Sequence, residues 1–306
     1  MISLLLCALI GVNVINRVAS KTCSNVVAAR NNQIRYLLYL TLVGAVACTV
    51  FFALGGFRIK VTGITLLYAQ IYSGVCVLSC ICNMEAFKLA NISGVVVLSS
   101  FGGLVATSLV GFFLFGEEIK LTTLLKIAIM LVAALLTFID AKRFEGPSAK
   151  RKSSATLKLI IIILLLILAG SGNNIILKLY GRAEGVADIN SMFFFTNAFQ
   201  GALALTLFLL LSFKGRRDET VRSQFRDSLN LFSIIPILAI AASTFSSNVG
   251  SLLSAELIKL MDMSVYTPVS SAAAILAGFI ASFIYRERHS VLFYLTAALS
   301  LAAVLI

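Results

Sequence analysis

The sequence predicts an all-α integral membrane protein with ten transmembrane helices, arranged as a five-plus-five inverted repeat around a central cavity. Three observations lead to this prediction. The chain is 59% hydrophobic and only 12% charged, its apolar segments are long and continuous, and short motifs recur in the same order in its two halves. A soluble domain carries about twice that fraction of charged residues. The composition therefore indicates that lipid covers most of the surface.

Ten apolar segments of about 17–24 residues supply the predicted helices, because roughly 20 helical residues cross a hydrocarbon core of about 30 Å. They cover residues 2–18, 36–56, 62–82, 92–115, 121–139, 157–179, 190–213, 231–254, 264–285 and 290–306. Barrel strands would alternate apolar and polar residues, so continuous runs favour helices. The chain has only three prolines, so few of these helices need to kink.

The helices of the first half carry a few polar residues each. Segment 2–18 is expected to remain in the protein, because no basic residues precede it and Asn13 and Arg17 follow in place of a cleavage site. Segment 62–82 holds Tyr72 and Cys76, with Asn83 directly after it, and segment 92–115 adds Ser99.

The eighth segment, residues 231–254, carries the strongest candidate site. Ser243, Ser247 and Ser251 are four residues apart, which places them on one helix face. Hydroxyls and amides bind polar solutes without fixed charge. Close packing of helices through small polar residues is the alternative interpretation. The candidate substrate-binding residues are Asn13, Arg17, Tyr72, Cys76, Asn83, Ser99, Asn174, Lys178, Ser243, Ser247, Ser251, Tyr266 and Ser270.

Two motifs occur once in each half. E-A-F-K-L-A-N-I-S at residues 85–93 matches E-L-I-K-L-M-D-M-S at 256–264, and G-x-N-x-x-x-basic occurs at 11–17 and 172–178. The predicted organisation is a first five-helix repeat at residues 1–139, a basic linker at 140–156 and a second five-helix repeat at 157–306. An odd number of helices in each half turns the second repeat over in the membrane.

The charged residues of these motifs suggest a gate at each mouth. Arg17 would pair with Glu85 near Lys88 at one mouth, and Lys178 would pair with Glu256 near Lys259 at the other. Either Arg17 or Lys178 could instead attract an anionic solute or reach the membrane interface. The interpretation of the Glu–Lys pairs as interfacial anchors stays open. The carboxylates Glu117 and Glu287 are also interpreted as interfacial anchors.

The basic residues set an expected orientation. The net charge is +12, but most basic residues lie in short loops, which favours contact with anionic lipid and argues against a nucleic-acid partner. Loops after odd-numbered helices hold 17 Lys and Arg residues and those after even-numbered helices hold 6. The positive-inside rule then places both termini outside the cell.

This pattern resembles the drug/metabolite transporter superfamily, and most of all its EamA-like branch, whose relatives include nucleotide-sugar and sugar-phosphate translocators. The stretch from Glu85 through F-G-E-E-I-K at 115–120 to Phe138 is most similar to that family. The resemblance implies a cavity lined by helices 1, 3, 4, 6, 8 and 9 that opens alternately to each side. Members of the family usually keep both termini in the cytoplasm, so the two indications of orientation differ.

We expect a secondary transporter of small polar organic metabolites, such as amino acids or their derivatives, in the cell membrane. A translocator of nucleotide-linked or phosphorylated sugars is the alternative, and a channel or membrane scaffold is the alternative from another class. No enzyme motif occurs, and neither a cofactor nor a metal is expected, since the six cysteines suit packing. Partners would be the solute and the bilayer. Coupling to protons or a counter-substrate, and homodimer formation, stay open.

Overall fold

The computed structural model describes residues 2–30, 33–89, 92–117, 121–144, 153–215, 234–286 and 291–305. These ranges form ten α-helices and contain no strand. The helices are α1 (Ile2–Arg30), α2 (Gln33–Leu54), α3 (Gly63–Leu89), α4 (Ile92–Phe115), α5 (Leu121–Phe144), α6 (Ser153–Arg182), α7 (Ile189–Gly215), α9 (Ile234–Leu260), α10 (Met263–Ile284) and α11 (Val291–Leu305).

Seven of these helices are long and apolar enough to cross a membrane. The qualifying segments in the described ranges lie in α1, α3, α4, α6, α7, α9 and α10, and α2 and α5 hold shorter apolar stretches. Large apolar side chains such as Phe113, Leu121 and Leu168 are exposed on the outside. Lipid accommodates such a surface, whereas water would not. The molecule is therefore an α-helical membrane protein.

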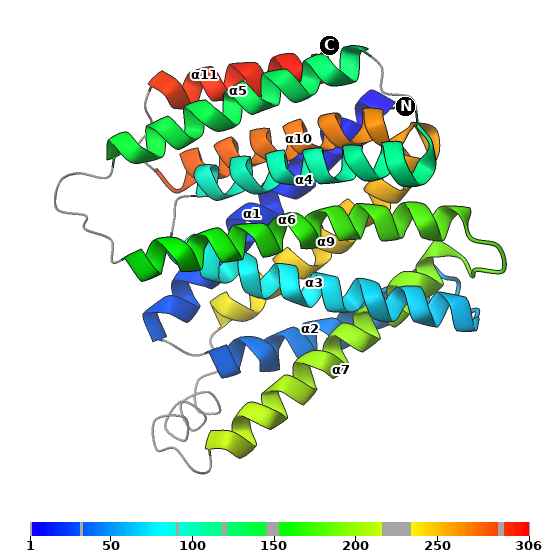
Figure 1. The fold of residues 1–306 in the computed structure, drawn as a ribbon. Coiled ribbons are helices and arrows are strands. Elements are labelled where there is room, and N and C mark those ends of the chain that lie inside the picture. Colours follow the sequence, from blue (N-terminus) through cyan, green and yellow to red (C-terminus); the bar gives the residue numbers. More distant parts are fainter. Residues whose placement is uncertain are drawn as a thin grey trace.

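The helices lie side by side, and successive helices run in opposite directions (Figure 1). α5 and α11 pack together at one edge of the molecule, and α2 packs on α7 at the opposite edge. α1, α3, α4, α6, α9 and α10 lie between these pairs. They form the centre of the molecule and carry almost all the polar residues that line its internal cavity.

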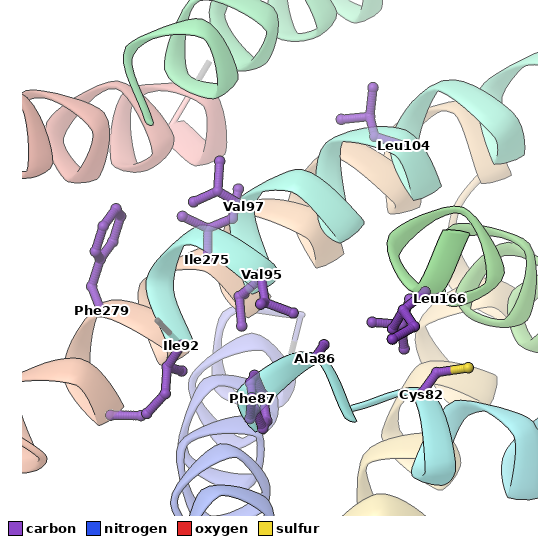
Figure 2. Packing of buried hydrophobic residues seen from close by; sticks show 13 residues of the cluster. Cys82, Ala86, Phe87, Ile92, Val95, Val97, Leu104, Leu166, Ile275 and Phe279 are labelled. Atoms are coloured by element: carbon purple, nitrogen blue, oxygen red, sulfur yellow. The ribbon is translucent and has the colours of Figure 1, made fainter. Parts of the chain in front are cut away.

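α4 is packed tightly between α6 and α10. Its buried residues Ile92 and Leu104 belong to an apolar cluster with Leu166 of α6 and Ile275 of α10 (Figure 2). Gly102 brings α4 close to α6: a Cβ added there would lie 2.2 Å from Cδ1 of Ile167. Small residues allow such close approach between membrane helices.

The two ends of the bundle are named here by their residues. The Phe87 end contains the last turns of α1 and α3 and the first turns of α6. The Glu117 end contains the last turns of α4, α6 and α9. The expected linker falls at the Phe87 end, where α5 extends to Phe144 and α6 begins at Ser153. Residues 145–152 of that linker lie outside the described residues.

Candidate solute cavity

A polar cavity lies inside the apolar bundle. Two adjoining spaces of about 140 and 240 Å³ form it, and they share eight lining residues. The shared residues are Asn16, Arg17, Tyr72, Ser79, Asn83, Asn173, Ser247 and Ser251. These residues come from α1, α3, α6 and α9, with α4, α7 and α10 completing the walls. We call the combined space the central cavity.

The structure brings twelve of the thirteen candidate substrate-binding residues to the central cavity. These are Asn13, Arg17, Tyr72, Cys76, Asn83, Ser99, Asn174, Ser243, Ser247, Ser251, Tyr266 and Ser270. Ser247 shows the geometry most clearly, because it is exposed although it lies in the middle of α9 and lines both spaces. The serine face predicted on residues 231–254 therefore points into a polar space.

Lys178 is the exception. Its side chain is buried at the Glu117 end, where it forms an ion pair with Glu117. The Lys178 ammonium also lies 4.9 Å from the ring centroid of Phe115, and the guanidinium of Arg182 contacts the same ring at 4.9 Å. Lys178 lines a different cavity of about 810 Å³ at that end. Lys178 therefore does not line the central cavity, and its ammonium is held at the Glu117 end.

The expected gate pairs are not the pairs that form in this conformation. Arg17 donates from Nη1 to Oδ1 of Asn83 at 3.2 Å. Glu85 instead binds Lys158 at 2.9 Å. The sequence spacing did not identify these contacts, because Asn83 lies closer to the middle of α3 than Glu85 does, and Lys158 comes from α6.

At the Glu117 end, Glu256 binds Lys259 of its own helix at 2.7 Å rather than Lys178. Both side chains of that pair are exposed by more than half, at 53% and 54%. An exposed pair of this kind stabilises a protein very little. Lys88 lies on α3 at the Phe87 end, and its side chain is outside the described residues.

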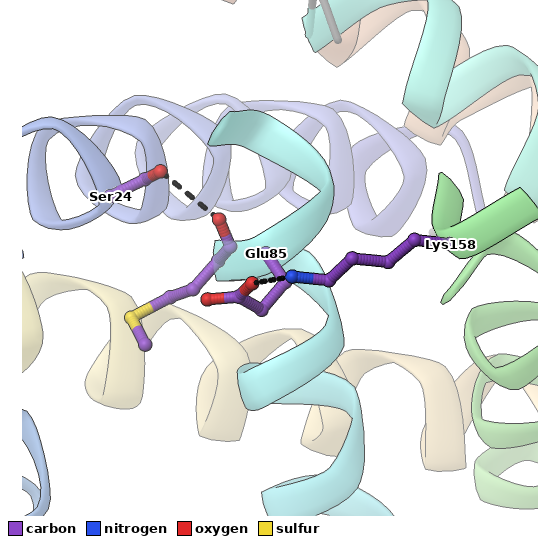
Figure 3. A network of polar contacts seen from close by, with 4 residues as sticks. Ser24, Glu85 and Lys158 are labelled. Carbon is purple, nitrogen blue, oxygen red and sulfur yellow. Dashed lines mark hydrogen bonds and ion pairs between the residues drawn. The ribbon is translucent and has the colours of Figure 1, made fainter. Parts of the chain in front are cut away.

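Hydrogen bonds between α1 and α3 close the Phe87 end. The Ser24 hydroxyl donates to the carbonyl of Met84 at 3.1 Å, and the neighbouring Glu85–Lys158 pair ties α3 to α6 (Figure 3). The ammonium of Lys21 donates to the carbonyl of Phe87 at 2.8 Å. Donors from α1 thus bind two backbone carbonyls near the end of α3. That of Phe87 lies in the last turn, where carbonyls have no partner within the helix.

Side-chain hydrogen bonds cross the central cavity walls. Tyr72 donates its hydroxyl proton to Oγ of Ser251 at 2.8 Å. The Ser243 hydroxyl lies 3.1 Å from that of Ser20, and both serines contact Asn16. Neutral groups thus bind one another across the cavity wall, and hydroxyl and amide groups of this kind can also bind a polar solute.

Several lining residues were absent from the sequence-based candidates. They are Asn16, Ser79, Asn173 and Gln200. Asn16 could have been found, because it lies three residues after Asn13 and thus on the same face of α1. Asn248 forms two hydrogen bonds with Asn197 of α7, at 3.0 and 3.3 Å. A pairing across helices of this kind has no signal in local spacing.

Glu117 was also misinterpreted from the sequence. A loop carboxylate after an apolar segment suggested an exposed interfacial anchor, but its side chain is only 7% exposed. The left-handed backbone of Gly116, with φ of 64°, ends α4 and precedes this carboxylate. Glu287, its expected counterpart, lies outside the described residues.

The described part of the chain contains no cluster of three or more His, Cys, Asp or Glu side chains that could hold a metal ion. The cysteines are unbridged thiols, and three of them line the cavity wall, namely Cys23, Cys76 and Cys80.

Among the comparisons with known proteins, the one with solved structures finds matches, and these concern the fold alone. No family model matches the chain, and no curated protein does. Twenty-four chains of solved structures match. One of them, designated "Crystal structure of protein", aligns over 96% of this chain and 95% of its own with a TM-score of 0.59 and 14% identity. At that identity the likeness concerns the arrangement of the helices.

Proposed function

We propose that this protein is a secondary transporter that carries small polar organic metabolites across the cell membrane by alternating access. The central cavity is the observation that carries the proposal. Polar side chains are costly within a membrane span and are concentrated where a solute or water passes. Here they converge on one space from six or more helices, while large apolar side chains cover the outside.

The packing of the helices supports a ten-span, five-plus-five inverted repeat. α1 packs on α9 and α10, and α6 packs on α3 and α4. α2 packs on α7, α4 on α10, and α5 on α11. If α1–α5 are exchanged for α6, α7, α9, α10 and α11 in that order, the contacts of α1 map onto those of α6, and each of the other three contacts maps onto itself. Such exchange symmetry is expected of inverted-repeat carriers, in which each half can adopt the conformation of the other.

Contacts between helices at both ends of the cavity favour a carrier over an open channel. The Lys178–Glu117 pair lies at one end, and the α1–α3 and α3–α6 contacts lie at the other. A carrier needs both closures and must release one at a time. The resemblance to EamA-like transporters supports the same proposal, in which the bilayer is that of a cell membrane.

Solute flux into proteoliposomes tests the proposal. Purified protein would be reconstituted into vesicles preloaded with a mixture of unlabelled amino acids, organic acids and sugars. Uptake of each labelled counterpart would then be compared with that of protein-free vesicles. We expect saturable uptake of at least one small polar solute, accelerated by the same solute inside. Uptake that stays proportional to concentration would indicate a channel, and no uptake of any solute would contradict the proposal.

Ser247→Phe is the matched variant for this experiment. A phenyl ring at Ser247 fills the central cavity, so flux should fall at least about tenfold while the protein elutes normally from a size-exclusion column. Leu168→Phe is the control, because Leu168 is 66% exposed on the outer face of α6. Normal flux in the Ser247 variant would show that the solute passes elsewhere.

A further inference from the structure

Arg17 is the one charged side chain that lines the central cavity among the described residues. The other lining residues carry hydroxyl, amide, thiol or apolar groups, and no Asp, Glu, Lys or His is among them. Its recorded contact is the single hydrogen bond to the neutral amide of Asn83. Arg17 lies near the middle of α1, inside the segment Leu4–Asn25 that is long and apolar enough to span a membrane.

An isolated cation at this depth is costly, because the surrounding helices and lipid replace water. Lys178, another buried cation of this protein, is compensated by the carboxylate of Glu117. Arg17 lacks such a partner in the described residues. A guanidinium has five N–H donors, and the bond to Asn83 uses one of them. The remaining donors match the two oxygens of a carboxylate.

We infer that Arg17 is the binding residue for the carboxylate of a small monoanionic organic acid, such as a hydroxy or keto acid. This inference rests on the proposed function and names its substrate class. One lining cation balances one negative charge. A zwitterionic amino acid would bring an ammonium group that finds no carboxylate on the cavity wall. A phosphate monoester would bring about −1.5 to −2 charges, more than Arg17 balances.

The volume of the cavity and a second polar group on its wall both suit a small acid. The cavity's two spaces of about 140 and 240 Å³ together lie near the small end of the roughly 300–1,000 Å³ range of ligand pockets, which favours a small acid over a nucleotide-linked sugar. The hydroxyl of Tyr266, a residue that is only 1% exposed, lines the larger space close to the hydroxyls of Ser254 and Ser270. It can bind the hydroxyl or keto oxygen of the acid.

Thermal stabilisation of the purified protein by three size-matched probes tests the charge. L-lactate is a monoanion, L-alanine a zwitterion and lactamide neutral at pH 7, and inorganic phosphate adds a more highly charged anion. Pyruvate, glycerate and propionate extend the acid series. A ligand at free concentration c that binds only the folded protein stabilises it by RT ln(1 + c/Kd), so the Tm rises with the logarithm of the ligand concentration above Kd. We expect such concentration-dependent stabilisation by the monocarboxylates and little by alanine, lactamide or phosphate.

Variants then assign the effect to Arg17. Arg17→Gln should weaken carboxylate binding on the order of 10- to 100-fold, because a charge-assisted bidentate contact is lost. Arg17→Lys keeps the charge without the planar fork and should be intermediate. Lys126→Gln is the control, since it also removes a buried cation from a membrane helix, on α5, but lies outside the cavity lining. Circular dichroism and size-exclusion chromatography establish that each variant is folded.

The outcomes separate the two proposals. Unchanged carboxylate affinity in Arg17→Gln, stronger stabilisation by alanine, lactamide or phosphate, or no response to any acid would each overturn the inference. If vesicles carry a neutral or zwitterionic solute and Arg17→Gln carries it equally well, the transporter proposal stands and the substrate class is wrong. If carboxylates bind through Arg17 but no solute crosses the vesicle membrane, the binding site stands and the transporter proposal fails.

Discussion

Asp188 directly precedes α7 and lies outside the membrane-spanning segments. Its side chain caps the first turn of that helix. One carboxylate oxygen accepts the backbone N–H of Ser191 at 3.1 Å and the other accepts its hydroxyl at 2.7 Å. Burial raises the pKa of Asp188, but these hydrogen bonds to Ser191 outweigh it and the pKa is lowered from its ordinary value. Satisfying a free N–H of the first turn and facing the positive end of the helix dipole both favour the charged form.

The sign of this pKa shift predicts a loss of stability in acid. A carboxyl group with a lowered folded pKa stabilises the protein fully above its unfolded pKa of about 3.9 and loses that contribution as the pH falls through the folded value. We expect the Tm in detergent to fall between pH 5 and pH 3, and to fall less steeply in Asp188→Asn. Asparagine caps a helix about as well as aspartate, so the two proteins should be similar at pH 7. Parallel pH profiles would contradict the assignment.

Single residues were predictable from the sequence where spacing along one helix decides the outcome. The four-residue interval of Ser243, Ser247 and Ser251 was enough to place them on one face, and that face lines the central cavity. The partner of a charged group was not predictable. Lys178 binds Glu117, which is 61 residues away in the sequence, and no local pattern encodes a contact between the end of α6 and the residue after α4.

At the scale of helices, hydropathy located each element but not its ends. The apolar segment 2–18 corresponds to the first part of α1, which continues to Arg30. Segment 231–254 corresponds to α9, which ends at Leu260. Apolar length reports the thickness of the hydrocarbon core. A helix continues past that core wherever its last turns find polar partners, as the end of α3 does in Ser24 and Lys21.

The contact between α4 and α6 depends on the absence of a side chain at Gly102. Alanine there would place its Cβ 2.2 Å from Cδ1 and 2.5 Å from Cγ1 of Ile167, so the isoleucine or the helix must move. We expect Gly102→Ala to destabilise the protein by about 1–3 kcal/mol, as overpacked cores do. Unfolding of the purified protein by heat or by added denaturing detergent measures the loss.

Two further variants make this prediction specific to the α4–α6 contact. Gly94→Ala lies on the same helix with nothing within 4 Å of the added Cβ, so it should be neutral or slightly stabilising through better helix propensity. Ile167→Ala should restore much of the stability when combined with Gly102→Ala, because it removes the clashing atoms. Equal effects of the Gly94 and Gly102 variants would mean that helix propensity, not packing, decides both.

For the whole molecule, the repeated motifs predict which helices would correspond in an inverted repeat, but not which helices touch. The equivalence of segments 62–82 and 231–254 is such a prediction. The packing of α3 on α6 and of α1 on α9 could not be predicted, because lateral order depends on complementary side chains from distant segments. Highly apolar helices have weak directional signals of their own, since lipid is as favourable a neighbour as another helix.

The ion pairs at the two ends of the molecule differ in burial, and under the proposed alternating access this difference can be tested. At the Glu117 end the ion pair is buried, with side chains 6% and 7% exposed, whereas Lys158 at the Phe87 end is 56% exposed. Removing one partner of a buried pair costs about 3–5 kcal/mol, because the other charge stays desolvated. Opening that end hydrates Lys178 and relieves the cost. A shift of a few kcal/mol is enough to invert a two-state equilibrium.

Glu117→Gln should therefore bias the protein toward opening at the Glu117 end. The measurement uses a protein whose native cysteines are replaced and which carries a new cysteine in place of Leu177. Leu177 lines both the central cavity and the cavity at the Glu117 end. The rate at which a hydrophilic thiol reagent labels that cysteine is then measured. We expect labelling of the cysteine at position 177 to accelerate at least about tenfold, and labelling of a cysteine at Ser20, toward the Phe87 end, to stay constant or slow.

Glu256→Gln is the matched control, since it neutralises an exposed carboxylate at the same end and should change neither rate. Adding Lys178→Met to Glu117→Gln removes the unpaired charge and should return both rates toward the parent values. Equal acceleration in the Glu117 and Glu256 variants, or acceleration at both cysteines together, would mean that the buried pair stabilises the fold without controlling which end is open.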